Sequence, residues 1–410
     1  MASHQRGVAG RYGDHCWTRY SRLRTGGAGR RPQARAVTLR QLAALDYASR
    51  APQLQRSLRV ASIEALLVTS LTNIRWLTGF TGSSAWLLVT HDEMLLVTDG
   101  RYGDQASAQL NDAGVHAGVG IGQTKAAQIA HVAQAFGSRT VLGFEGAHIS
   151  YAEHASLSSK LEASWTPTEG LVETHRRTKD QGELDRMARA GAIADAALAA
   201  TLPLLAHEPT EVELRDALEA AMRQLGAEAP SFDTIIAAGA NATMPHHRPD
   251  QTRIIEGMTV VIDFGALFDG YHSDMTRTFT MGDPTPMQDE VFQVVLQAQC
   301  AGVAAVAAGA SGRGIDDLCR AAIAGAGWGD WFTHGTGHGV GLQIHESPWL
   351  TQSFDDTLQV ADVVTVEPGV YRRDFGGVRI EDMVVVATHG CEPLTKTPKD
   401  SPCLPLQPTN

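Results

Sequence analysis

Short apolar runs separated by polar turn residues make up the chain between residues 48 and 174. Four of them are bounded by Gly, Asp or Ser, as buried strands commonly are, and they cover 64–70, 84–90, 93–100 and 140–146. Between the last two, the apolar residues of 124–136 recur at the spacing of a helix. This alternation predicts an α/β domain.

A long helix is predicted over 175–206, where Thr178 with Gln181 three residues later forms a capping-box pattern. Its first residues are polar and charged, which is typical of a joint between domains, so we place the domain boundary at its start. A second capping-box pattern, Thr210 with Glu213, predicts another helix. The chain is thus expected to divide into three parts, 1–47, 48–174 and 175–410.

The first 47 residues differ in composition from the rest of the chain. Up to residue 40 they hold nine arginines but a single acid, Asp14, and they show no sustained periodicity. Such a segment buries too little apolar surface to fold, so we predict a disordered basic extension. An arginine-rich, acid-poor composition is also that of a targeting peptide, and this alternative stays open.

Two carboxylates are predicted to meet in the segment 258–280. The segment alternates around a central Asp-Gly pair, which predicts a hairpin with a two-residue turn. In that register Asp263 lies opposite Thr276, and Asp274 lies two residues along the same strand on the same face. Like charges so placed force one acid to take up a proton unless a cation lies between them. The alternative is a solvated acidic face.

A second acidic pair lies in 363–387, in two strand-like runs on either side of a Gly-containing loop. With that loop centred near Asp374, Glu367 lies opposite Glu381. Apolar strand residues flank both glutamates, so we expect their carboxylates to be buried, where an unpaired charge shifts its pKa or binds a cation. The second pair favours a metal site over a solvated face.

The stretch THGTGHGVGLQIHESP (333–348) holds His334, His338 and His345 among glycines. Glycine weakens helix and strand alike, so we expect little core here. One such histidine with four carboxylates makes a ligand set for two divalent ions, whose charge balances that of the four acids. Coordination rich in oxygen favours Mn²⁺, with Co²⁺ or Zn²⁺ as alternatives.

These motifs resemble the five-ligand signature of the pita-bread metallopeptidases, and more closely the Xaa-Pro branch with aminopeptidase P and prolidase. The matching residues are Asp263, Asp274, His338 in HGTGHGVG, Glu367 in VEPGVY and Glu381 in RIED. The stretch LTNIRWLTGFTGSSAWLLVT (71–90) is similar to the amino-terminal domain of that branch, and RTKDQGELDRM resembles its interdomain helix. The resemblance implies a creatinase-type α/β domain followed by a pita-bread α+β catalytic domain.

The resemblance also implies roles for individual residues. It makes the five matching residues metal ligands. In a two-metal hydrolysis, Glu367 is then our candidate to accept the proton of the water and pass it to the leaving nitrogen. His246 in MPHHRP and His345 would contact the substrate, although the adjacent His247 leaves open which of the two neighbours points inward. The residues expected to line the substrate site are His334, Tyr371 and Arg379.

The implied function is an exopeptidase that uses two metal ions to hydrolyse the Xaa-Pro bond of dipeptides or short peptides. Three alternatives remain. A methionine aminopeptidase-like enzyme would leave the first domain without a use, a creatinase-like hydrolase works without metal, and a non-catalytic peptide-binding scaffold usually loses ligands. The chain length slightly favours a prolidase-like dipeptidase over aminopeptidase P, and the resemblance implies a homodimer or a higher homo-oligomer.

Bulk composition limits the partners and the location. A net charge of −11 argues against a nucleic-acid or anionic-membrane partner. The five cysteines are scattered and contain no CxxC pair, which predicts free thiols in a reducing compartment. No uninterrupted apolar run approaches the roughly 18 residues that a membrane helix needs. We therefore predict a cytoplasmic protein.

Overall fold

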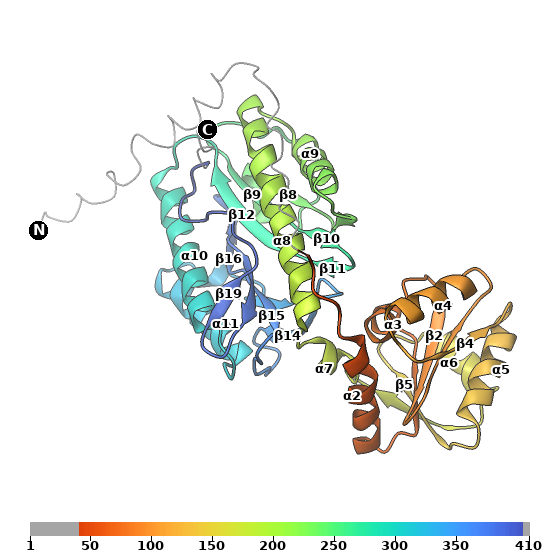
Figure 1. Ribbon diagram of the computed structural model, residues 1–410. Coiled ribbons are helices and arrows are strands. Elements are labelled where there is room, and N and C mark those ends of the chain that lie inside the picture. Colours follow the sequence, from red (N-terminus) through yellow and green to blue (C-terminus); the bar gives the residue numbers. More distant parts are fainter. Residues whose placement is uncertain (1–40, 405–410) are drawn as a thin grey trace, which may run out of the picture. The chain divides into compact units, whose positions relative to one another are not determined.

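The computed structural model describes residues 41–404 (Figure 1). The chain forms two compact units, one of Ala43–Gly182 and one that begins at Glu183 and also includes residues 41 and 42. The basic extension predicted over 1–47 lies outside the described residues as far as residue 40. Asp46 caps the first described helix by accepting a hydrogen bond from the backbone N–H of Ser49.

The first unit is built on a mixed six-stranded sheet with the order β4-β3-β2-β1-β5-β6. Its strands are β1 (Ala65–Val68), β2 (Ala85–Thr90), β3 (Met94–Thr98), β4 (Gly118–Ile121), β5 (Val141–Glu145) and β6 (Ser164–Thr168). Its helices are α2 (Tyr47–Val60), α3 (Leu71–Thr78), α4 (Gly103–Asp112), α5 (Lys125–Phe136), α6 (Tyr151–Ser158) and α7 (Glu173–Arg176). The four predicted strands and the predicted helix at 124–136 are confirmed.

The second unit holds the longer helices and a set of antiparallel strands (Figure 1). Its helical segments are α8 (Gln181–Thr201), η1 (Leu202–His207), α9 (Glu211–Gln224), η2 (Gly239–Thr243), α10 (Pro286–Ala305), α11 (Gly312–Gly325) and η3 (Gly329–Trp331). The strands before α10 are β7 (Ala229–Pro230), β8 (Ile235–Ala238), β9 (Thr259–Phe264), β10 (Ala266–Phe268), β11 (Tyr271–His272) and β12 (Met275–Thr280). Those after α11 are β13 (Gly337–Gly339), β14 (Glu346–Leu350), β15 (Val363–Val366), β16 (Gly369–Arg372), β17 (Gly376–Arg379), β18 (Asp382–Val386) and β19 (Cys391–Pro393).

Within the second unit, helices cover the strands from two sides. On one side α8 and α9 pack Leu198 and Leu218 against Ile262 of β9, all of them buried. On the other side α10 and α11 pack Val295 and Ile323 into a cluster with residues of β16 and β17. Burial of each such side chain contributes roughly 1.5–3 kcal/mol, so the strands between the helices are held firmly in place.

The first predicted hairpin is confirmed in its register. Asp263 pairs with Thr276, and the turn residues Asp269 and Gly270 have φ of 45° and 75°, as a two-residue turn of type I′ requires. The ladder is interrupted at Gly265, where a Cβ would lie 1.8 Å from the carbonyl oxygen of Ser273. This close approach of the two strands divides the hairpin into β9–β12 and β10–β11, and it places Asp274 at the break.

The second predicted hairpin also has the expected register. Val366 pairs with Asp382 on one side of the two glutamates, and Gly369 pairs with Arg379 on the other. Glu367 and Glu381 therefore lie between two strand ladders, and both ladders have the register in which these glutamates were predicted to face each other. Both glutamates lie at a break in the pairing, as Asp274 does, and their side chains are directed by the strands on either side.

One of the two predicted helices of the second unit differs from the sequence-based expectation. The continuous helix predicted over 175–206 is wrong, because the segment contains α7, a non-helical link, α8 and the 3-10 helix η1. Pro203 lies in the first turn of η1 and has no N–H to continue the α-helical ladder of α8. The helix predicted from Thr210 and Glu213 is confirmed as α9, with both hydrogen bonds of the capping box formed.

The glycine-rich stretch forms more core than predicted. Its centre is β13, a buried strand that lies between β14 and β15 in a five-stranded sheet. A Cβ on Gly337 would lie 2.0 Å from the carbonyl oxygen of Thr365, and a Cβ on Gly339 would lie 2.5 Å from that of Ser347. Glycine is needed here because neighbouring strands approach closely, so the expectation that these residues form little core was wrong.

One prediction about the cysteines was also wrong. Cys300, Cys319 and Cys391 are free thiols as expected, but Cys403 is disulfide-bonded.

Among the described residues, one helical stretch is long and apolar enough to cross a membrane, Gln181–His207. Of its most apolar window, 56% is buried within the protein. The core helix of an ordinary globular domain meets the same criterion, so this stretch is weak evidence for a membrane span.

Candidate metal centre

Five side chains from five different strands or strand ends converge in the second unit. Asp263 lies on β9, Asp274 precedes β12, His338 lies on β13, Glu367 follows β15 and Glu381 precedes β18. One ligand atom each from Asp274, His338 and Glu381 lie within 4.8 Å of one another. Glu367 is next to this group, with Oε1 at 3.3 Å from Nε2 of His338. The structure thus brings together the residues that the sequence singled out.

Two buried oxygens of this cluster have no hydrogen-bond partner. They are Oδ1 of Asp263 and Oε1 of Glu381, and both belong to carboxylates whose other oxygen accepts a hydrogen bond. A buried carboxylate oxygen without a donor is costly, and a bound cation removes that cost. The donor set of four carboxylates and one imidazole fits divalent metal ions.

The orientation of His338 suits a ligand. Its side chain is buried, and its Nδ1 donates a hydrogen bond to the carbonyl oxygen of Gly339 at 3.0 Å. When a metal ion is bound, this hydrogen bond leaves Nε2 to coordinate the ion. Nε2 lies 3.6 and 3.3 Å from carboxylate oxygens of Asp274 and Glu367. Metal-binding histidines commonly have their other ring nitrogen fixed in this way.

The acids strongly perturb each other. Burial, and then the charges of Glu381 and Asp263, raise the pKa of Asp274 well above its ordinary value. The pKa of Glu381 is likewise raised well above its ordinary value by burial and by Glu367 and Asp263. Burial also acts on Glu367, but its hydrogen bond and charge interaction with His338 outweigh burial and lower its pKa to about 2. When no cation is bound, burial and mutual repulsion thus favour the protonated forms of Asp274 and Glu381, which is the direction predicted from the sequence.

The guanidinium of Arg379 donates hydrogen bonds to residues of the metal centre. It is 3% exposed, and its Nη2 donates to Oδ2 of Asp263 at 2.5 Å while its Nη1 donates to the hydroxyl of Tyr371 at 2.6 Å. That hydroxyl lies 2.9 Å from Nε2 of His334, whose Nδ1 bonds the carbonyl oxygen of Gly335 at 2.8 Å. His334, Tyr371 and Arg379 thus form a hydrogen-bonded chain that ends on Asp263.

The structure distinguishes the two adjacent histidines of MPHHRP. His247 is buried, with Nε2 at 2.7 Å from Oε2 of Glu211, which is itself 0% exposed. His246 is exposed and lines the same pocket as the carboxylates. His246 is therefore the neighbour that is free to contact a ligand, and His247 ties its loop to α9.

A second group of possible metal ligands, Glu211, His247 and Asp250, is held by hydrogen bonds. Oε1 of Glu211 accepts from the backbone N–H of Ala238 at 2.7 Å, and Oε2 accepts from His247 and from the N–H of Asp250 at 3.0 Å. With its oxygens already supplied with donors, this group is a structural tie.

The pocket above the cluster has a volume of about 600 Å³, which lies in the range of small-molecule sites. His345 is at its wall, with its ring centroid 4.4 Å from that of His338. Burial and the neighbouring His338 lower the pKa of His345, which favours its neutral form. An aromatic wall that the sequence did not predict is formed by Trp349 stacked on Phe354, with centroids 5.6 Å apart.

Comparisons with known proteins agree with this arrangement. The model for the Creatinase/Prolidase N-terminal domain matches residues 50–178, and that for metallopeptidase family M24 matches residues 185–388. The uncharacterized peptidase YqhT of Bacillus subtilis is 39% identical over 341 residues, which is 82% of this chain and 95% of that protein.

Solved structures give the same result. An Xaa-Pro dipeptidase from Bacillus anthracis is 36% identical with a TM-score of 0.83, covering 87% of this chain and 99% of its own. An X-Pro aminopeptidase from Thermotoga maritima is 31% identical with a TM-score of 0.77, covering 85% and 98%. The predicted combination of a creatinase-type domain and a pita-bread metallopeptidase domain is confirmed. The chain belongs to the Xaa-Pro branch of metallopeptidase family M24.

Proposed function

We propose that this protein is a metal-dependent exopeptidase that hydrolyses the Xaa-Pro bond of dipeptides or short peptides. The observation that carries the proposal is the buried cluster of four carboxylates and His338, with two oxygens that lack a donor, at the base of a pocket of peptide size. The solved structures of an Xaa-Pro dipeptidase and an X-Pro aminopeptidase match this chain over nearly their whole length.

The proposed ligands are Asp263, Asp274, His338, Glu367 and Glu381, and the proposed ions are two Mn²⁺, with Co²⁺ or Zn²⁺ as alternatives. Such ions, when bound, polarise the substrate carbonyl and make a water molecule nucleophilic near neutral pH. Oxygen-rich coordination supports Mn²⁺ over metals that prefer thiolates.

Glu367 is the proposed proton carrier. Its carboxylate lies beside the proposed ions, with Oε1 3.3 Å from Nε2 of His338, where it can accept a proton from the attacking water. It would then deliver that proton to the proline nitrogen, which leaves as a secondary amine. The hydroxyl of Thr365 donates to Oε1 of Glu367 at 3.3 Å and helps to fix the carboxylate for this transfer.

His246 and His345 are the proposed contacts to the substrate on the pocket wall. Both are exposed there, so each can donate a hydrogen bond to the developing oxyanion or accept one from the leaving group. For His334, Tyr371 and Arg379 we propose an indirect role, in which they act on the site by holding Asp263. Their donors are already used within the hydrogen-bonded chain, so they shape the site and hold this acid.

A dipeptidase must bind the free carboxylate of proline, and Arg248 is our candidate for that task. It lines the pocket, and its side chain is 90% exposed with Asp233 at 3.9 Å, a weak contact. Arg379 also lines the pocket, but its guanidinium donates to Asp263, Tyr371 and Thr276. A largely exposed guanidinium with only this weak contact, two residues from His246, favours the dipeptidase over the aminopeptidase.

The test is the hydrolysis of Ala-Pro and Ala-Pro-Ala by purified protein, with and without added Mn²⁺. We expect metal-dependent cleavage of both peptides at the Xaa-Pro bond or of Ala-Pro alone, and a preference for Ala-Pro identifies the dipeptidase. Metal-independent turnover of creatine would favour the creatinase-like alternative. Cleavage of an amino-terminal methionine would favour the methionine aminopeptidase-like alternative. Binding of peptides without cleavage in the presence of Mn²⁺ would favour the scaffold.

The homodimer or higher homo-oligomer and the cytoplasmic location stay predictions. Light scattering on the eluted peak of a size-exclusion column measures the first, and fractionation of cells measures the second.

A further inference from the structure

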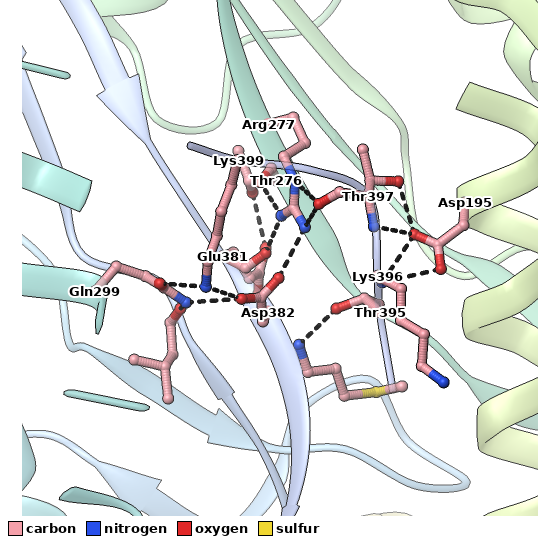
Figure 2. A network of polar contacts seen from close by, with 12 residues as sticks. Asp195, Thr276, Arg277, Gln299, Glu381, Asp382, Thr395, Lys396, Thr397 and Lys399 are labelled. Carbon is pink, nitrogen blue, oxygen red and sulfur yellow. Dashed lines mark hydrogen bonds and ion pairs between the residues drawn. The ribbon is translucent and has the colours of Figure 1, made fainter. Parts of the chain in front are cut away.

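A second polar cluster holds the segment that carries Glu381, one of the proposed metal ligands (Figure 2). It joins Arg277 of β12, Gln299 of α10, Asp382 of β18 and Lys399 near the carboxyl end of the described chain. None of these four residues is among those that line the pocket. Any influence they have on catalysis must therefore act through the residues that they hold.

Arg277 is 2% exposed and uses every N–H of its guanidinium. Nη1 donates to the carbonyl oxygens of Glu381 and of Thr276, the latter at 2.9 Å. Nε and Nη2 donate to the carbonyl oxygen of Thr397 at 3.0 and 2.6 Å, and Nη2 also donates to Oδ1 of Asp382 at 2.8 Å. An arginine engaged at all five donors fixes the relative positions of its partners, because its fork is planar and rigid.

Asp382 is held at both of its oxygens. Oδ1 accepts from Arg277, and Oδ2 accepts from Nε2 of Gln299 at 3.1 Å and from Nζ of Lys399. Lys399 also donates to Oε1 of Gln299 at 2.5 Å, so the three side chains close a ring of hydrogen bonds. Because Asp382 directly follows Glu381, these contacts fix the backbone on which the Glu381 carboxylate is mounted.

The segment 395–399, which we call the C-terminal clamp, is tied from both sides (Figure 2). Asp195 of α8 accepts hydrogen bonds from the backbone N–H groups of Lys396 and Thr397, at 2.9 and 2.8 Å. On the side of β18, the hydroxyl of Thr395 accepts from the N–H of Met383 at 3.1 Å. The clamp thus lies between α8 and β18 and presents Lys399 to Asp382.

We infer that Arg277, Asp382 and Lys399 are positioning residues for Glu381, and that the C-terminal clamp sets the affinity of the centre for divalent ions. This inference rests on the proposed function, because it takes Glu381 as a ligand. Residues that hydrogen-bond to metal-binding groups typically account for a 10–100-fold change in metal affinity.

Two lysines of the clamp provide a matched test. Lys399→Met removes a partner of Asp382 at a side chain that is 24% exposed. Lys396→Met removes the same charge at an exposed residue that is tied to Asp195 through its backbone N–H. Metal-free protein is titrated with Mn²⁺ by calorimetry, and its Tm is measured without metal. We expect the Mn²⁺ Kd to rise about 10-fold in Lys399→Met and to stay at the wild-type value in Lys396→Met.

The sign of the change makes the test decisive. Loss of a positive charge near the site would by itself tighten the binding of a cation, so an unchanged or lower Kd in Lys399→Met overturns the inference. A purely structural role would lower the Tm of the metal-free protein and leave Kd unchanged, which also overturns it. If Lys399→Met does not fold, Asp195→Ala loosens the clamp from its other side and carries the same expectation. Absence of Mn²⁺ binding in the wild type would contradict the proposed function instead.

Discussion

Buried acids in the two units meet the cost of burial in opposite ways. In the first unit Glu145 is 4% exposed, and its oxygens accept from two backbone N–H groups that lead into α3, at 2.6 and 2.7 Å, and from the amide of Asn73 at 2.6 Å. In the second unit Asp263 and Glu381 each leave one buried oxygen without a donor. The first arrangement is complete as it stands, whereas the second is completed by cations.

The groups that surround the buried acids also differ between the two units, and so does their effect on the pKa values. The pKa of Glu145 is raised by burial and, more weakly, by the charge of Glu173, while hydrogen bonds from Asn73, Ser70 and Thr69 oppose the rise. Burial also raises the pKa of Asp274, but there the charges of neighbouring acids raise it further. A buried acid surrounded by donors supports the fold, and a buried acid surrounded by other acids indicates a site for a positively charged ligand.

The largest expected effect comes from removing a proposed ligand. Asp263→Ala and His338→Ala should each lower kcat/KM for Ala-Pro by well over the roughly 100-fold that loss of an outer partner costs, because a ligand itself is lost. Circular dichroism should show that both variants remain folded. Near-wild-type activity of either variant in a Mn²⁺-replete assay would contradict the ligand assignment.

A half-buried histidine in the second unit, His272, extends the comparison to the pH dependence of stability. Burial lowers the pKa of His272 to about 4, and its Nδ1 lies 2.7 Å from the hydroxyl of Ser231. Between about pH 6.5 and 4 the unfolded chain binds a proton at this residue and the folded chain does not, so stability falls as the pH is lowered through this range, by up to about 3 kcal/mol. Urea unfolding between pH 7 and 4 should show that the stability of His272→Gln falls less steeply with decreasing pH than that of the wild type. An identical pH dependence of the two proteins would rule out this contribution.

Glu145→Gln tests the structural side of the comparison. An amide cannot accept from all the donors that now face the carboxylate, so we expect unfolding free energy to fall by about 1–3 kcal/mol. The Mn²⁺ Kd and the kcat for Ala-Pro should stay at wild-type values. A change in metal affinity in this variant would contradict the view that only the acids of the second unit bind cations.

Arg248→Gln addresses the substrate end of the site and has the smallest expected effect. Loss of one charge-assisted contact to the proline carboxylate should raise KM for Ala-Pro about 10-fold and leave kcat nearly unchanged. KM for Ala-Pro-amide, which has no carboxylate, should not change. Arg253→Gln, whose residue is not among those that line the pocket, serves as the control. An equal rise in KM for both peptides would remove Arg248 from the role of carboxylate reader.

Local signals predicted the frame of the site well. The Asp-Gly turn and strict alternation determine the pairing of Asp263 with Thr276, and the shared register around Glu367 and Glu381 follows from one loop. These are relations between residues close in sequence, where turn geometry fixes the register. The ligand set could be proposed from them and from the family resemblance.

Long-range contacts could not be predicted in the same way. Nothing near Arg277 in the sequence indicates that Thr397 accepts two of its hydrogen bonds, since more than a hundred residues separate them. The roles of the neighbours His246 and His247 depend on Glu211, which lies in a different helix. The buried strand β13 escaped prediction because its glycines are selected by close contacts with β14 and β15.

The most direct test of the central claim is the metal stoichiometry of the purified protein, by elemental analysis after loading with Mn²⁺ and removal of excess metal. We predict two ions per chain in the wild type and fewer in Asp274→Ala, which lacks one of the acids that the centre brings together. A wild-type protein that retains no Mn²⁺, or an Asp274→Ala variant that still retains two ions, would contradict the account.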